Sequence, residues 1–287
     1  MIKKRTFILN TNNCILDTAD LYKLLTFALH NLKIHEMSKR LENKVVIVTG
    51  ASKGIGAGIA KKMGEAGAKV VVNYGSDKES ADAVVAEITK LGGHAISVQG
   101  DMTKQSDVNT LFEEAVKVYG GLDVLVNNAG VYEFALLESF SEDSYRRTFD
   151  LNVLGLLLAT QQAVKLFGEN GGSIINISSF ASVRPEPYSV VYAASKGAVD
   201  TITLSLSQEL GVKNIRVNAI RPGGVLTEGT MKLGVTEASD SIKSMVARSS
   251  LGFMATPTDV ASMVIFFASD ESKAITGQTI EVSGGFK

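Results

Sequence analysis

The sequence predicts an α/β protein with a doubly wound parallel sheet. Short apolar stretches such as residues 45–49 (VVIVT) have the composition of parallel strands covered on both faces. Segments with helical periodicity alternate with these stretches, as repeated strand–helix–strand units require. From residue 37 onward the chain has neither a linker rich in proline, glycine or serine nor an internal repeat of solenoid length. We therefore expect a single domain whose sheet has seven strands.

The predicted elements follow one another in regular order. Each strand is a run that contains Val or Ile, and the first two helices stop at Gly67 and Gly92, because glycine readily ends a helix. The predicted strands are residues 45–49, 69–74, 95–99, 124–126, 173–177, 215–219 and 279–282. The predicted helices are residues 55–66, 80–91, 105–119, 145–167, 191–210 and 258–268.

The first 36 residues differ from the rest of the chain. They open on a basic stretch but contain no continuous apolar core and no small-residue cleavage site, so we do not expect a secretory signal. Asp17 and Asp20 argue against an organelle transit peptide, which is normally poor in acids. Their leucines repeat at helical spacing and can dock on the body or on a partner subunit. We expect residues 1–36 to be an N-terminal extension, with Met37 as an alternative start, and residues 37–287 to be the domain.

Composition excludes several classes of function. Lysine and arginine total 29 against 30 acidic residues, so the formal net charge is −1. Nucleic-acid-binding proteins usually carry a basic excess or stripe, and neither is present. No apolar run reaches the roughly 18 residues of a membrane span. The single cysteine, Cys14, cannot form an internal disulfide and fits a reducing cytoplasm. We expect no nucleic-acid partner, no membrane partner, no metal and a cytoplasmic localisation.

The segment TGASKGIG, residues 49–56, joins the first predicted strand to the first predicted helix. Gly50 can make the tight turn, Gly54 lets the backbone approach a pyrophosphate, and Gly56 allows close helix packing. The N-terminus of the helix offers free N–H groups and the positive end of its dipole. The spacing departs from G-x-G-x-x-G, and the alternative is a glycine-rich turn without a ligand. Between a buried strand and a helix, the segment predicts a Rossmann-type dinucleotide site.

The end of the second predicted strand bears on the choice of cofactor. An NAD site usually places an acidic residue there, bonded to the ribose 2′-hydroxyl, whereas this chain has Asn73. Asn73, Tyr74 and Ser76 can donate hydrogen bonds to a 2′-phosphate, and the glycine loop adds the charge of Lys53 and the hydroxyl of Ser52. NADP(H) is therefore preferred, and NAD(H) remains the alternative.

The segment YAASK places Tyr192 and Lys196 one helical turn apart on one face. The unperturbed pKa of tyrosine, about 10, is too high for acid–base work at neutral pH. A nearby ammonium and a positive nicotinamide ring would stabilise the tyrosinate and lower the pKa of Tyr192. Ser179, at the end of a predicted strand, can donate to a substrate carbonyl oxygen. A Tyr and a Lys at this spacing are often only a surface pair, but the phosphate loop and Ser179 favour a catalytic role.

Seven motifs or single residues follow one another along the chain. They are TGASKGIG, Asp101 in GDMT, NNAG at residues 127–130, Asn152, Ser179, YAASK, and RPGG with Thr227. From residue 39 to residue 286 the chain thereby resembles the short-chain dehydrogenase/reductase family, in its ketoreductase branch, which includes 3-oxoacyl-carrier-protein reductases. One departure is VSGG, where Ser283 replaces an Asp that is frequent in the family.

The resemblance implies a role for each matching residue. Tyr192 is the general acid in carbonyl reduction and the general base in alcohol oxidation. Ser179 polarises the substrate oxygen, Lys196 binds the nicotinamide ribose and lowers the pKa of Tyr192, and Asn152 holds a water that links Lys196 to solvent. The predicted cofactor contacts are Gly50, Ser52, Lys53, Gly54, Ile55, Gly56, Asn73, Tyr74, Ser76, Asp101, Met102, Asn128, Ala129, Gly130, Tyr192, Lys196, Pro222, Gly223, Val225 and Thr227.

These expectations combine into a function. The segments 131–140, 180–188 and 226–253 should shape the substrate pocket, and the last should act as a moving lid. Their apolar and aromatic residues suit a bulky or aromatic ketone better than a sugar. We expect an NADPH-dependent carbonyl reductase, and the resemblance implies a homotetramer. The alternatives are an NAD-dependent alcohol or sugar dehydrogenase on the same fold and a nucleotide-binding regulator without turnover.

Overall fold

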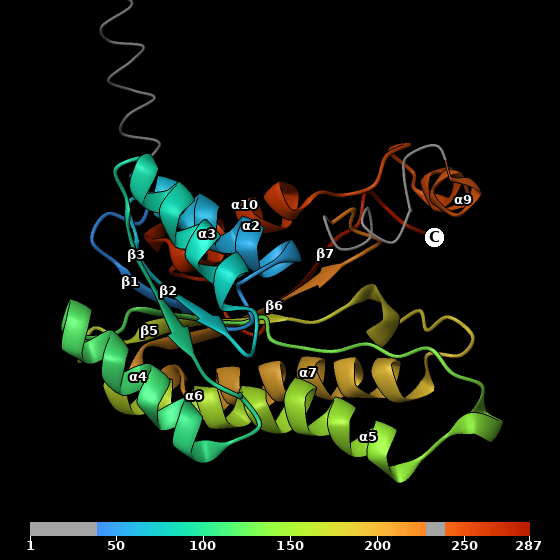
Figure 1. Ribbon diagram of the computed structural model, residues 1–287, viewed down its shortest axis with the longest axis horizontal. Helices are drawn as coiled ribbons and strands as arrows, with labels where there is room; N and C mark the ends of the chain where they lie inside the picture. Colours follow the sequence, from blue (N-terminus) through green and yellow to red (C-terminus); the bar gives the residue numbers. More distant parts are fainter. Residues whose placement is uncertain (1–38, 228–238) are drawn as a thin grey trace, which may run out of the picture. The chain divides into compact units, whose positions relative to one another are not determined.

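A computed structural model describes residues 39–227 and 239–287 of the chain (Figure 1). The chain divides into two units, Met1–Arg40 and Leu41–Lys287. The leucine-rich part of the predicted extension and the central part of the predicted lid lie outside the described residues. Among the described helices, none has the length and apolar character needed to cross a membrane.

The second unit is built on a parallel sheet of seven strands in the order β3-β2-β1-β4-β5-β6-β7. All seven predicted strands are present: β1 (Val45–Val48), β2 (Lys69–Tyr74), β3 (His94–Gln99), β4 (Val124–Asn127), β5 (Gly172–Ile177), β6 (Ile215–Pro222) and β7 (Thr279–Val282). The chain runs outward from β1 to β3 and then returns to place β4 on the other side of β1. This reversal opens a crevice at the carboxyl ends of β1 and β4, which is where open α/β sheets bind their ligands.

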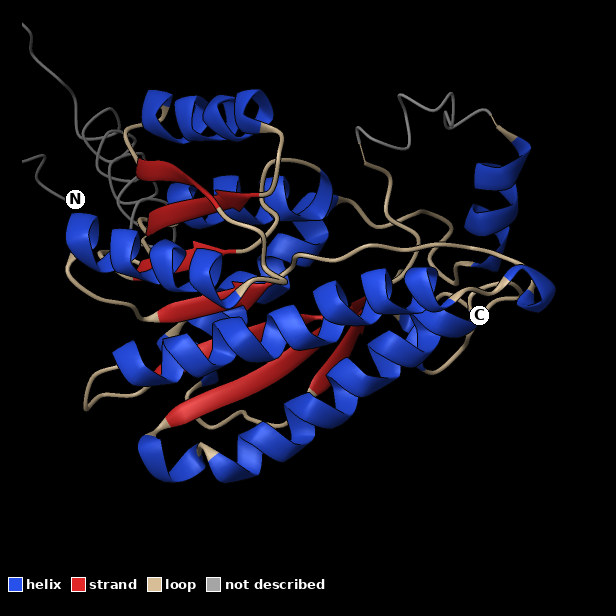
Figure 2. Ribbon diagram, turned by 60° about the horizontal axis from the view of Figure 1, so that its bottom comes forward, coloured by secondary structure: helices blue, strands red, loops and turns tan. Residues whose placement is uncertain are grey.

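Helices cover both faces of the sheet, as the two views show (Figures 1 and 2). The helices α2 (Gly54–Glu65), α3 (Lys78–Lys90) and α10 (Pro257–Ala268) pack on one face, in one hydrophobic cluster. The helices α4 (Gln105–Tyr119) and α6 (Leu156–Leu166) pack on the other face, and α7 (Val190–Glu209) lies along the same layer. Side chains of β1 alternate between the two clusters, with Val46 and Val48 in the first and Ile47 in the second. The doubly wound fold is therefore confirmed.

The predicted helix over residues 145–167 is not one regular α-helix. It begins earlier, as α5 (Glu142–Phe149), because the Ser141 side chain accepts a hydrogen bond from the Ser144 N–H and caps it. A π-helical turn, Asp150–Gly155, then separates α5 from α6. Such wide turns occur frequently at functional sites. Here the turn contains Asn152, which the sequence predicts to be catalytic.

Candidate active site

A cavity of about 860 Å³ occupies the crevice at the carboxyl end of the sheet. It extends from the glycine loop to Ser179 and Tyr192, so the predicted phosphate and catalytic residues share one space. The predicted site residues that line it are Gly50, Ser52, Lys53, Gly54, Ile55, Gly56, Asn73, Ser76, Asp101, Met102, Asn128, Ala129, Gly130, Ser179, Tyr192, Lys196, Pro222, Gly223 and Thr227. Three predicted residues do not line it, namely Tyr74, Asn152 and Val225.

The glycine loop has the conformation that a phosphate cradle needs. Gly50 and Gly54 have φ values of +60° and +59°, in the left-handed region that favours glycine. A Cβ at residue 56 would lie 2.4 Å from the Asn128 Nδ2 atom and 2.6 Å from the Gly50 carbonyl oxygen. The helix that follows, α2, has no side-chain cap and no acidic residue in its first turn. Its N–H groups and positive dipole end therefore face the cavity without a competing carboxylate, which fits a dinucleotide pyrophosphate.

Asn73 has a different role from the predicted one. Its side chain is buried, its Oδ1 accepts from the Gly50 N–H at 3.0 Å, and its Nδ2 donates to the carbonyls of Val98 and Gly100 at 3.4 and 3.1 Å. Both amide hydrogens are used, so Asn73 fixes the glycine loop rather than offering a donor to a 2′-phosphate. Tyr74 is also buried and belongs to the hydrophobic core.

The charged residues at this end of the cavity are Lys53 and Asp77. Lys53 is exposed at the start of α2, and Ser76 is exposed at the end of β2. The carboxylate of Asp77 accepts from the N–H and the hydroxyl of Ser80, and so caps α3. This capping commits Asp77 to α3. Ser52, Lys53 and Ser76 are therefore the predicted 2′-phosphate donors that remain at the cavity.

Thr49 is a supporting residue that sequence reasoning missed. Its Oγ1 accepts from the N–H groups of Asn128 at 3.0 Å and Ala129 at 2.9 Å, which joins β1 to the NNAG segment. The Asn128 side chain in turn donates to the carbonyls of Thr49 and Gly50. The signal available in the sequence was the position of Thr49 at the end of a buried strand, directly before the glycine loop.

The three residues with predicted central catalytic roles meet at the far end of the cavity. Tyr192 and Lys196 lie in α7, and Ser179, which follows β5, lines the same cavity. The Lys196 Nζ donates to the Ile177 carbonyl at 2.8 Å and lies 6.0 Å from the centre of the Tyr192 ring. Burial lowers the pKa of Lys196 to about 8, against the opposing charge of Asp200. The charged ammonium form of Lys196 is therefore only weakly favoured over the neutral amine at neutral pH.

The pKa of Tyr192 departs from the sequence expectation. Burial raises the pKa of this phenol above its ordinary value, and the hydrogen bond from Ser179 lowers it by less. The expected lowering by Lys196 is not produced by the chain itself, since the ammonium is bound to a backbone carbonyl and no contact joins it to the phenol oxygen. Tyr192 is accordingly protonated at neutral pH, as a proton donor must be.

Asn152 lies next to this group but does not itself line the cavity. Its side chain is buried in the π-helical turn, accepts from the Val131 N–H at 2.8 Å, and donates to the Val131 carbonyl and to Ser195 Oγ. A Cβ at Gly130 would lie 3.1 Å from the Asn152 Oδ1 and 3.5 Å from the Lys196 Nζ, so the two residues approach the same backbone point. Asn152 therefore joins the NNAG segment to α7.

The remaining predicted contacts lie at two edges of the cavity. Asp101 accepts from both the N–H and the hydroxyl of Thr103, and these bonds hold the pKa of its carboxyl below the ordinary value. Thr227 lies across the cavity from Gly54, where a Cβ would be 3.7 Å from the Thr227 Cγ2. Val225 contributes a backbone bridge to Ala255. The predicted segment 226–253 is described only up to residue 227 and from residue 239.

Aromatic side chains surround the catalytic tyrosine. The rings of Tyr132, Phe134 and Tyr192 form a triangle with centroid separations of 6.1, 6.3 and 6.3 Å. The rings of Tyr132 and Phe134 are more than half exposed. This aromatic triangle provides an apolar surface beside the proton donor.

Comparisons with known proteins agree with this geometry. A family model described as Enoyl-(Acyl carrier protein) reductase matches residues 50–287. An uncharacterized oxidoreductase of Methylorubrum extorquens is 53% identical over 251 residues, 88% of this chain and 100% of that protein. The versicolorin reductase of Emericella nidulans is 39% identical over 254 residues, 86% of this chain and 96% of that protein. The structure of the angucycline C-6 ketoreductase LanV with bound NADP has a TM-score of 0.79 at 36% identity, over 86% of this chain and 96% of that one. The chain belongs to the short-chain dehydrogenase/reductase family and is an oxidoreductase that acts on CH–OH or C=O groups.

Proposed function

We propose that the chain is an NADPH-dependent carbonyl reductase that converts a ketone to a secondary alcohol, reversibly, with Tyr192 as general acid and base. The observation that carries the proposal is that Ser179 and Tyr192 line the same cavity as the glycine loop, with the Ser179 side chain close enough to lower the pKa of Tyr192. A proton donor and a dinucleotide cradle in one space provide what carbonyl reduction requires. The nicotinamide supplies the hydride when it is bound.

Each residue of the chain has a separate task in this mechanism. Tyr192 holds the proton that the carbonyl oxygen receives, and its raised pKa keeps that proton in place until the oxygen becomes basic. Ser179 donates a second hydrogen bond to the same oxygen and so stabilises the developing charge. Lys196 would bind the nicotinamide ribose, and Asn152 would hold a water that links Lys196 to solvent.

The preference for NADPH rests on charge at the adenosine end. Lys53 and Ser76 line this end, and Asp77, the nearest acid after β2, is engaged in capping α3. A 2′-phosphate would thus meet a cation and a hydroxyl, with the neighbouring carboxylate already hydrogen-bonded. LanV, a relative in structure, binds NADP. Asp101 and Met102 would flank the adenine, and Val225 and Thr227 would bind the carboxamide.

The substrate proposed is a bulky apolar or aromatic ketone. The aromatic triangle gives it a surface on which rings pack edge to face or offset, worth about 0.5–1.5 kcal/mol per pair beyond area burial. The names of two relatives describe them as a versicolorin reductase and an angucycline C-6 ketoreductase. We include in the proposal a homotetrameric assembly, a cytoplasmic location and a domain that starts at Met37.

The test is the initial rate of NADPH and NADH oxidation with aliphatic ketones, aromatic ketones and β-keto esters. Faster turnover with NADPH and with aromatic ketones is the expected result. Faster turnover with NADH would favour the alternative of an NAD-dependent alcohol or sugar dehydrogenase. An absence of turnover with both cofactors on every ketone would contradict the proposed activity.

A further inference from the structure

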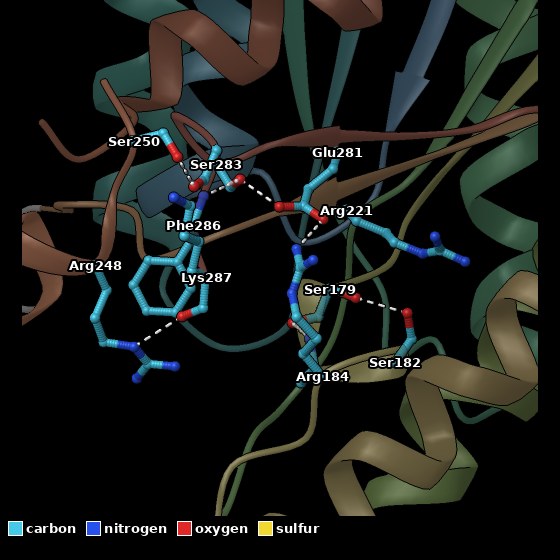
Figure 3. A network of polar contacts seen from close by, with 12 residues as sticks. Ser179, Ser182, Arg184, Arg221, Arg248, Ser250, Glu281, Ser283, Phe286 and Lys287 are labelled. Carbon is cyan, nitrogen blue, oxygen red and sulfur yellow. Dashed lines mark hydrogen bonds and ion pairs between the residues drawn. The ribbon is translucent and has the colours of Figure 1, made fainter. Parts of the chain in front are cut away.

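The last four residues, 284–287, form a tail that joins two separate parts of the substrate end of the cavity. One part is the catalytic loop, which we define as residues 179–188. The other is α9 (Asp240–Arg248) with the turn that follows it. These parts and the tail are far apart in the sequence but meet in one polar network (Figure 3).

The tail pairs with the turn after α9 through its backbone. The N–H groups of Ser250 and Leu251 donate to the carbonyls of Gly285 and Gly284 at 3.2 and 3.0 Å. The Lys287 N–H donates to the Arg248 carbonyl at 3.0 Å, and the Arg248 Nε donates to the Lys287 carbonyl at 2.9 Å. The tail is thus fixed to the end of α9 by bonds on both sides of Phe286.

Phe286 links this assembly to the catalytic loop. Its side chain is buried, and its ring meets the ring of Phe180 edge to face with 4.9 Å between centroids. The Arg248 guanidinium lies 4.3 Å from the centroid of the same ring and forms an ion pair of 2.6 Å with Glu186. Phe180 directly follows Ser179, so the Phe286 ring is in contact with the neighbour of the catalytic hydroxyl.

A second connection runs from β7 to the same loop. Glu281 forms an ion pair with Arg184 and also accepts a hydrogen bond from Ser283. Ser283 accepts from the Phe286 N–H at 3.1 Å, so the residue that departs from the family pattern caps the turn that aims Phe286 inward. On its other side, α9 contacts the segment after β6, because a Cβ at Gly224, the neighbour of the cavity residue Gly223, would lie 3.3 Å from the Met245 Sδ.

We propose that Phe286 is a positioning residue that holds the catalytic loop against α9 and thereby sets the affinity for the ketone. The kinetic consequence rests on the proposed function. Without the ring, the loop that carries Ser179 and the helix α9 lose their common support. Phe286 touches neither Tyr192 nor Lys196 among the described contacts, so its effect passes through Phe180 and Arg248.

The experiment compares Phe286→Ala with the parent chain by hydrogen exchange and by steady-state kinetics. Exchange should become faster in residues 180–188 and 240–248 and stay unchanged in α2. The KM for the ketone should rise about tenfold, with the dissociation constant of NADPH within twofold of the parent value. Phe286→Tyr keeps the ring and should restore both readouts.

Phe112→Ala is the matched control, because Phe112 is an equally buried phenylalanine in α4 on the far cluster. It should lower the melting temperature without raising the KM for the ketone. The Arg248 side chain is partly exposed, so Arg248→Gln replaces Phe286→Ala if that variant does not fold. Arg248→Gln should raise the KM for the ketone about threefold. Exchange that is unchanged in the catalytic loop, or a KM equal to that of Phe112→Ala, overturns the proposal. The exchange readout needs no turnover, so it remains decisive if the parent chain reduces no ketone.

Discussion

The two ends of the cavity are held in place by different means. At the cofactor end, buried side chains fix the backbone, with Asn73, Thr49 and Asn128 bonded to the glycine loop and its neighbours. At the substrate end, the surface consists of exposed rings, and the N–H of Ala135 reaches across to the Tyr188 carbonyl. The structure of the cofactor end therefore depends on close packing, which tolerates few substitutions. The substrate end depends instead on exposed side chains, which can be substituted more freely.

Lys196 lies between the two ends and should give the largest change. Lys196→Met removes the ammonium below the proton donor, and we expect kcat to fall about 10²-fold or more. Because the folded pKa of about 8 lies below the unfolded value of 10.5, the unfolded state binds the proton more tightly between these pH values. Lys196→Met removes this cost at pH 7 together with the hydrogen bond to the Ile177 carbonyl, so its free energy of unfolding should exceed that of the parent by less than the ionisation cost alone.

Denaturant unfolding across pH measures this difference. The parent chain should gain stability relative to Lys196→Met as pH rises from 8 to 10.5, because the buried amine loses its charge. A parent chain that is more stable than the variant at pH 7 would contradict the burial argument.

Gly56 tests whether the cofactor end depends on close packing. Gly56→Val places side-chain atoms where Asn128 and the Gly50 carbonyl already lie. The dissociation constant of NADPH should rise about 100-fold, which corresponds to about 3 kcal/mol. Gly121→Ala is the control, because a Cβ at Gly121 would have nothing within 4 Å. Calorimetric titration measures both, and near-parent affinity in Gly56→Val would break the comparison.

Variants of Asn73 and Lys53 distinguish support of the glycine loop from recognition of the 2′-phosphate. Asn73→Ala leaves the Gly50 N–H and the Gly100 carbonyl without their partner, so stability should fall by about 1–3 kcal/mol. NADPH and NADH should then bind more weakly by the same factor. Lys53→Ala should raise the KM for NADPH about tenfold and leave that for NADH unchanged. An equal loss for both cofactors in Lys53→Ala would remove Lys53 from the 2′-phosphate site.

The smallest effect is expected at the substrate end. Phe134→Ala removes two ring contacts of the aromatic triangle, and the KM for an aromatic ketone should rise about two- to fivefold. NADPH binding should not change. Leu91→Ala, an exposed apolar residue that follows α3, is the control and should alter neither value. A rise in the KM of an aliphatic ketone as large as that of the aromatic one would argue against ring packing.

Much of the fold was predictable, because its central strands are buried on both faces and their apolar composition shows it. The break between α5 and α6 was not, since a π-helical turn leaves the pattern of leucines and alanines largely intact. The role of Asn73 was missed because an amide suits a phosphate and a backbone equally well in sequence. The tail was missed because Phe180, Arg248 and Phe286 meet only in three dimensions. The motifs of the cofactor end were recognisable because close packing restricts the residues there.

The central claim is that Tyr192 delivers the proton from a cavity whose cofactor end is built independently of it. The most direct measurement is the turnover number of Tyr192→Phe with NADPH and an aromatic ketone, alongside the dissociation constant of NADPH. The account predicts a loss of turnover of about 10²–10⁴-fold, because a positioned proton donor contributes that much. NADPH binding should stay within a few fold, since the buried contacts of the glycine loop are untouched. Near-parent turnover in Tyr192→Phe would contradict the account.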